Sequence, residues 1–89
     1  MEFKHDNNKI YLGDSADNNK AEISYSHGGQ TLIIDRTFVA DELKGKGIAK
    51  ELVKAMADYA RQEGYKIMPL CWYAKKVMES NSEYHDLLV

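Results

Sequence analysis

The sequence predicts an α+β domain with a mixed β-sheet and one central helix. Residues 31–39 are rich in the β-branched and aromatic side chains that favour a strand. From Ile48 onward apolar residues recur at intervals of three and four, the period of a helix with one buried face. A short loop with two glycines, residues 41–47, joins the two elements, so we expect the fold to be organised around a strand, loop and helix unit.

The first thirty residues predict an antiparallel meander of short strands. Apolar and polar side chains alternate there in short runs, which is the period of a sheet with one buried face. Polar turn clusters at 14–19 and 27–30 separate these runs. We expect the meander to lead into the strand at 31–39.

The C-terminal part predicts one more strand and short helices. Gly64 is placed to cap the central helix, and residues 65–71 indicate a strand in which Pro69 marks an edge or the point where pairing stops. Residues 73–80 carry apolar side chains at the spacing of a buried helical stripe. Residues 83–88 are expected to form a last turn.

Length and composition limit the classes of function. A chain of 89 residues suits one domain with a modest core, and a net charge of -2 provides no overall field for nucleic acid or an anionic membrane. One cysteine excludes an internal disulfide, and no apolar signal core or run of about 20 apolar residues is present, so a cytoplasmic location is expected. The cysteine and three scattered histidines lack zinc-site spacing, so we expect no metal site.

The glycine loop carries the strongest functional signal. Gly45 and Gly47 precede the first turn of the helix, where backbone N–H groups have no intrahelical partner. These donors and the positive end of the helix dipole favour phosphate, and Lys44 and Lys46 add positive charge. The two usual nucleotide fingerprints are absent, since Lys50 stands where a third glycine would follow and no G-K-[ST] closes the loop. A tight turn with solubilising lysines is the alternative.

Residues 43–53, followed by 64–67, resemble the acetyl-CoA motif of the GCN5-related N-acetyltransferases, written Q/R-x-x-G-x-G/A. The short chain and the run 71–73 after the next strand are similar to those of the compact YjdJ-like subfamily. The likeness covers residues 33 to about 84. Glu42 stands where the motif has Gln or Arg, so the resemblance implies phosphate contacts from backbone donors and not from this side chain.

The resemblance implies a compact fold in which the strands before and after the central helix splay apart and admit the pantetheine arm of acetyl-CoA. Larger members have helices after the first strand, but residues 12–20 are too few and too polar to form them, which implies an open acceptor side suited to a protein or peptide, or one completed by a second subunit. Lys75 and Lys76 are placed to contact the outer phosphates of the cofactor. The alternative is that both lie on a solvated face of a short helix. The implied cofactor-contacting residues are Phe38, Val39, Ala40, Lys44, Gly45, Lys46, Gly47, Ile48, Ala49 and Lys75.

Cys71 and Tyr73 are the candidate catalytic residues. An acetyl thioester is already activated, so the site must position an amine, polarise the carbonyl and protonate the leaving thiolate. Backbone N–H groups near residues 38–40 are candidates for polarising the carbonyl. Cys71 precedes a helix N-terminus, which lowers a thiol pKa, and is either a covalent nucleophile or a small buried residue. Tyr73 is either the acid, as a tyrosine is in many relatives, or a packing residue. No general base is assigned, because all three histidines lie in turn-rich or terminal segments: His5, His27 and His85.

Two functions therefore remain. The first is an acetyl-CoA-dependent N-acetyltransferase, a monomer or homodimer, acting on a primary amine of a small molecule, a peptide or a lysine side chain. The second is a module that binds CoA, an acyl-CoA or a partner protein without useful turnover.

Overall fold

The computed structural model describes residues 2–89, which form a five-stranded sheet with the strand order β1-β2-β3-β4-β5. The first four strands pair antiparallel, and β5 is parallel to β4. The predicted α+β class, with its mixed sheet and N-terminal meander, is confirmed. The strands are β1 (Lys4–Asp6), β2 (Lys9–Ser15), β3 (Asn18–Gly28), β4 (Thr31–Val39) and β5 (Lys66–Pro69).

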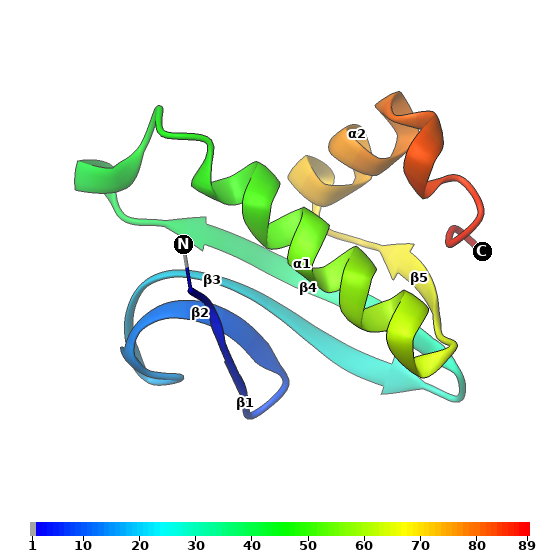
Figure 1. Cartoon of the computed structure of the whole chain (residues 1–89), viewed down its shortest axis with the longest axis horizontal. Coiled ribbons are helices and arrows are strands. Elements are labelled where there is room, and N and C mark those ends of the chain that lie inside the picture. The colour runs from blue at the N-terminus through cyan, green and yellow to red at the C-terminus, as the bar shows by residue number, and fades with distance from the viewer. Residues whose placement is uncertain (1) are drawn as a thin grey trace.

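Both helices pack on one face of this sheet. Helix α1 (Ile48–Glu63) lies across the sheet, and α2 (Trp72–Ser80) lies beside α1 near β5 (Figure 1). Alternate residues of the strands meet the apolar stripes of both helices in one core, and burying each large side chain contributes about 1.5–3 kcal/mol. The largest fully buried side chains are Ile23, Leu32, Ile34, Leu52, Val53, Met56, Ile67 and Met78.

Glycines bound α1 at both ends. Gly47 at its N-terminus has φ 77° and Gly64 at its C-terminus has φ 79°, the left-handed conformation that glycine adopts without a steric penalty. The N–H of Tyr65 closes the C-terminal turn on the carbonyl of Ala60 at 2.8 Å. The predicted start of the helix and its glycine cap are therefore confirmed.

Strand β5 is shorter than the predicted range of 65–71. The N–H groups of Leu70 and Cys71 both donate to the carbonyl of Ile34, at 3.0 and 3.1 Å, so the regular ladder stops there. Pro69, the last residue of β5, has no N–H with which to extend pairing. Helix α2 then begins at Trp72, one residue before the prediction.

The C-terminal segment covers the outer edge of β5. After α2 the chain forms a short 3₁₀ turn, Ser82–Tyr84, and hydrogen-bonded turns continue as far as Leu87, so the turn expected over 83–88 is confirmed. The N–H of Ile67 then donates to Leu87 at 2.7 Å, and Val89 donates to Ile67 at 3.2 Å. Pairing of this kind protects an edge strand from association.

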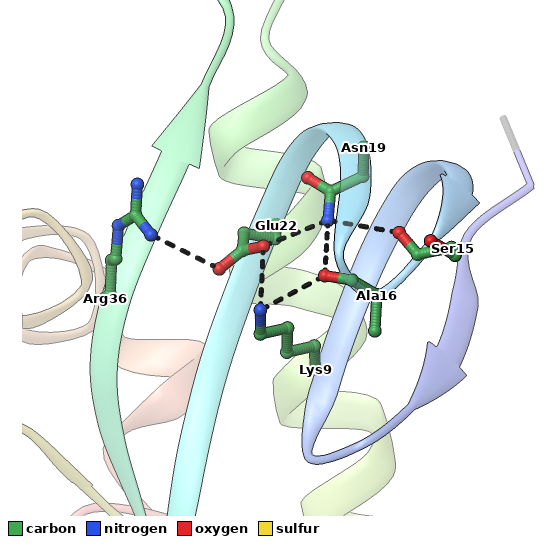
Figure 2. A network of polar contacts seen from close by, with 6 residues as sticks. All are labelled: Lys9, Ser15, Ala16, Asn19, Glu22 and Arg36. Carbon is green, nitrogen blue, oxygen red and sulfur yellow. Dashed lines mark hydrogen bonds and ion pairs between the residues drawn. The ribbon is translucent and has the colours of Figure 1, made fainter.

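The sheet face opposite the helices holds a buried carboxylate. Glu22 is 5% exposed, and its side chain lies 3.3 Å from the Lys9 ammonium, 3.0 Å from the Asn19 amide and 3.7 Å from the Arg36 guanidinium (Figure 2). Asn19 and Lys9 also donate to the carbonyl of Ala16. The network fixes the β2–β3 hairpin. This hairpin contains residues 12–20, which were expected to be too few and too polar to form helices. Within residues 2–89 this face carries no helix, and no helix of that range is suited by length and hydropathy to a bilayer.

Candidate functional site

A β-bulge marks the point at which β4 and β5 separate. The two strands pair from Thr31 as far as Ile34, opposite Pro69. On its other side β4 pairs with β3, and the register shifts so that Asp35 is the extra residue. A bulge bends and twists a strand. Beyond it β4 is paired with β3 alone, and a gap opens where β5 has left the sheet.

The hydrogen-bond pattern determines which N–H groups face this gap. Ala40 donates to the carbonyl of Lys20 on β3 at 2.7 Å. Successive residues of a strand direct their N–H groups to opposite sides, so Phe38 also faces β3, whereas Thr37 and Val39 face the gap. Phe38 and Ala40 thus direct their N–H groups into the sheet, which corrects the expectation of free donors at these two residues; of residues 38–40, Val39 directs its N–H to the gap.

The glycine loop opens onto the same side of the molecule. Gly45 and Gly47 have φ values of 80° and 77°, and a Cβ atom at either position would meet no atom within 4 Å. The backbone therefore borders open space at both residues. The first N–H groups of α1, at residues 47–50, have no intrahelical acceptor and are available to a ligand.

A groove of about 660 Å³ joins the glycine loop to the gap. Its walls come from the end of β4, the loop with the first turn of α1, and the first turn of α2. A volume of this size suits a small-molecule ligand. The site residues expected from the sequence that line the groove are Phe38, Val39, Lys44, Gly45, Gly47, Ile48, Ala49, Cys71 and Tyr73.

Three of the expected residues lie outside the lining of this groove. They are Ala40, which faces β3, and the lysines Lys46 and Lys75. Four lining residues were not assigned from the sequence: Thr37, Leu43, Lys50 and Trp72. Two of them had a usable signal, since Thr37 lies two residues before Val39 on a strand and Lys50 lies one turn after Gly47.

The Cys71 thiol lies at the bottom of the gap, half-buried, and donates to the Thr37 hydroxyl at 3.5 Å. Burial raises the pKa of this thiol. The thiolate, once formed, would accept hydrogen bonds from the Thr37 hydroxyl and from the backbone N–H groups of Ala74, Tyr73 and Thr37, and these outweigh burial, so the pKa lies below its usual value. The thiolate is the reactive form of cysteine. The environment therefore increases the fraction of Cys71 that is reactive.

Tyr73 has the opposite shift. Burial raises the pKa of its phenol, which keeps the proton in place at neutral pH. The groove thus combines a thiol that ionises more easily with a phenol that ionises less easily. Such a pair has the protonation states expected of a nucleophile and an acid.

The histidines and the motif glutamate lie elsewhere. His5 is 2.6 Å from the Tyr25 hydroxyl, and its ring packs on Tyr59 of α1, while His85 contacts the carbonyl of Glu79. Glu42 forms an ion pair with Lys20 at 2.8 Å. Within residues 2–89 no histidine or carboxylate lines the groove, so the structure does not place a side-chain base in it.

Comparison with known proteins agrees with this geometry. The family described as GCN5-related N-acetyl-transferase matches residues 9–87. Protein NATD1 of Xenopus tropicalis is 36% identical over 63 residues, which are 70% of this chain and 58% of that protein. Protein NATD1 of Danio rerio is 33% identical over 86 residues, covering 91% of this chain and 76% of that protein. The chain spans under three fifths of the length of the Xenopus tropicalis and Mus musculus proteins.

A solved structure shows the same fold. The NMR solution structure of a GCN5-like protein from Staphylococcus aureus superposes with a TM-score of 0.83 at 39% identity, covering 99% of this chain and 87% of that one. The compact fold that the resemblance implied is therefore confirmed. The family match extends over nearly all of the chain, and the protein belongs to the GCN5-related N-acetyltransferase family.

Proposed function

We propose that the protein is an acetyl-CoA-dependent N-acetyltransferase that acts on a primary amine of a small molecule, a peptide or a lysine side chain. One observation carries the proposal. A single groove connects the free N–H groups at the start of α1 with the Cys71 thiol in the gap beside β4, so one extended ligand can contact both.

The residues of the groove fit a diphosphate at one end. Gly45 and Gly47 leave open space next to the unpaired N–H groups of α1, where the helix dipole is positive. Lys44 and Lys50 also line the groove; the Lys44 ammonium lies 3.0 Å from the Asp41 carboxylate, whereas Lys50 has no acidic partner within 4 Å among residues 2–89. The gap beyond Val39 then accommodates the thioester arm.

The chemistry requires few groups. Acetyl-CoA would supply an acetyl group that is already activated as a thioester. The Val39 N–H faces the gap and can donate to the carbonyl oxygen as negative charge develops there. The Tyr73 phenol retains its proton and can give it to the departing sulfur. Holding the amine against the carbonyl carbon supplies most of the remaining acceleration.

Cys71 can take part directly. Its thiolate would attack the carbonyl carbon, the bond to the CoA sulfur would break, and that sulfur would take the Tyr73 proton. The amine nitrogen would then attack the acetyl group on Cys71, and the bond to Sγ would break. The Cys71 thiolate is restored by this cleavage, and the proton that the amine loses returns to the Tyr73 oxygen, directly or through water, so the phenol is restored as well. Direct attack by the amine, with Cys71 as a half-buried wall residue, is the alternative.

The test is the release of free thiol from acetyl-CoA when primary amines are added. Amine-dependent release that matches the amount of acetylated amine supports the proposal. Replacing Cys71 with alanine separates the two routes, because nearly full activity of this variant would exclude the covalent one. With the parent protein, a mass increase of one acetyl group on Cys71 in the absence of amine would support it.

A module that binds CoA or an acyl-CoA without turnover is the second candidate. Two observations favour it. Within residues 2–89 no histidine or carboxylate lines the groove, and the sheet face opposite the helices carries no helix that would wall an acceptor site. Both candidates bind CoA. CoA binding without thiol release across a broad panel of amines would favour the module.

A further inference from the structure

A second groove continues from the first. It has a volume of about 350 Å³, lies between the first turn of α1 and helix α2, and shares Lys50, Trp72 and Tyr73 with the first groove. Its far end is formed by Lys76 and by the last residues of α2. A ligand that occupies the first groove can therefore extend a further group into the second.

The charge of the second groove favours an anion. Lys50 and Lys76 line it, and no carboxylate of residues 2–89 does. Five basic side chains of residues 2–89 have an acidic partner within 4 Å, whereas Lys50 and Lys76, like five other lysines, have none, so their charge is not compensated within the chain. Two uncompensated ammonium groups repel a cationic amine and attract a phosphate. The groove is thus poorly suited to the acceptor substrate.

Trp72 gives the groove an aromatic surface. The side chain is 74% exposed at the first residue of α2, and its ring meets Tyr73 only edge-on, with the ring centres 6.0 Å apart. An exposed indole face beside cationic side chains suits a planar aromatic base, because stacking needs only a free π-face.

We propose that the second groove binds the adenosine 3′-phosphate end of CoA, with the adenine stacked on Trp72 and the 3′-phosphate held by Lys50 and Lys76. The inference rests on the proposed function, since it assigns the part of CoA that lies beyond the diphosphate. That part is the one that carries both an aromatic base and a separate phosphate, the two groups that the groove fits.

The test uses the intrinsic fluorescence of Trp72, which is the only tryptophan of the chain. Three ligands are titrated: CoA, dephospho-CoA, which lacks the 3′-phosphate, and 4′-phosphopantetheine, which lacks the adenosine. CoA and dephospho-CoA should quench the fluorescence, and 4′-phosphopantetheine should not. CoA should bind roughly tenfold or more tightly than dephospho-CoA, because a charge-assisted contact is lost in the latter.

Lys76→Ala and Lys75→Ala form a matched pair, because the two lysines are neighbours on α2 and only Lys76 lines the groove. Lys76→Ala should reduce the preference for CoA over dephospho-CoA, and Lys75→Ala should leave it unchanged. Equal affinities for CoA and dephospho-CoA in the parent, or equal effects of the two substitutions, would overturn the inference and leave the proposed function standing. Absence of CoA binding by calorimetry would overturn both.

Discussion

Gly47→Ala, with Gly64→Ala as a control, separates the backbone role of the glycine loop from its role in binding. Gly47 precedes α1 and Gly64 follows it, and both have the left-handed conformation, with φ of 77° and 79°. A Cβ atom at either position would meet no atom within 4 Å. Each alanine should therefore cost only the backbone strain, about 1–2 kcal/mol. In a domain of this size each kcal/mol lowers Tm by about 4–8 °C. Thermal unfolding followed by circular dichroism should give similar losses for the two variants.

Glutamate at the same two positions tests whether the start of α1 binds the diphosphate of CoA. A carboxylate at position 47 would face the proposed diphosphate, and the repulsion of two such charges at 4 Å lies between about 1 and 4 kcal/mol, depending on the local dielectric. The affinity for CoA should thus fall roughly fivefold to several hundredfold. The 16 residues of α1 separate position 64 from position 47, a distance of about 25 Å, so Gly64→Glu should leave the affinity unchanged.

Isothermal titration with CoA measures both variants. If Gly47→Glu binds CoA as the parent does, or if Gly64→Glu weakens binding to the same degree, the start of α1 is not the phosphate site. In that case the glycines serve the turn alone.

Three further predictions concern stability and the thiol. Glu22→Gln should lower the free energy of unfolding in urea by about 1–3 kcal/mol, because the carboxylate is buried in its network, whereas Glu42→Gln, in an exposed ion pair, should cost at most about 1 kcal/mol; equal losses would contradict this. Leu52→Ala, at a fully buried site, should cost about 2–5 kcal/mol in the same assay, and a loss below about 1 kcal/mol would be inconsistent with the core described. Thr37→Val removes a hydroxyl that lowers the pKa of Cys71, so alkylation of the thiol by iodoacetamide should require a higher pH; an unchanged midpoint would mean that backbone donors alone set the pKa.

The elements of the fold were predictable from the sequence because their signals are local. The composition of 31–39 and the apolar period from Ile48 each indicate one element without reference to the rest of the chain. The bulge was not predictable. Leu32 and Ile34 face the core before it and Val39 faces the core after it, so the inward positions change from even to odd numbers. The outward-facing residues Ile33 and Phe38 are apolar as well. The change in which positions face the core is therefore not visible in the apolar pattern of the sequence.

The same distinction applies to the site. The glycine loop is one continuous segment, and its position before a helix was visible in the sequence. Trp72 and Lys50 line the groove because segments far apart in sequence meet there, which no local pattern indicates. Which of Lys75 and Lys76 lines a groove depends on how α2 is placed around its axis. Neighbouring residues of a helix differ in direction by about 100°, so the sequence alone does not distinguish the two lysines.

The groove is a consequence of how the sheet ends. The carbonyl of Ile34 accepts the N–H groups of both Leu70 and Cys71, which terminates β5 and turns the chain into α2. The bulge at Asp35 lies at the next residue of β4 and bends that strand at the level where β5 leaves it. One short region therefore opens the gap and also brings the Cys71 thiol to the Thr37 side chain at its bottom. Because the end of the sheet places the last residues of β4 opposite the first turn of α2, two of the three walls of the groove follow from the backbone pairing alone.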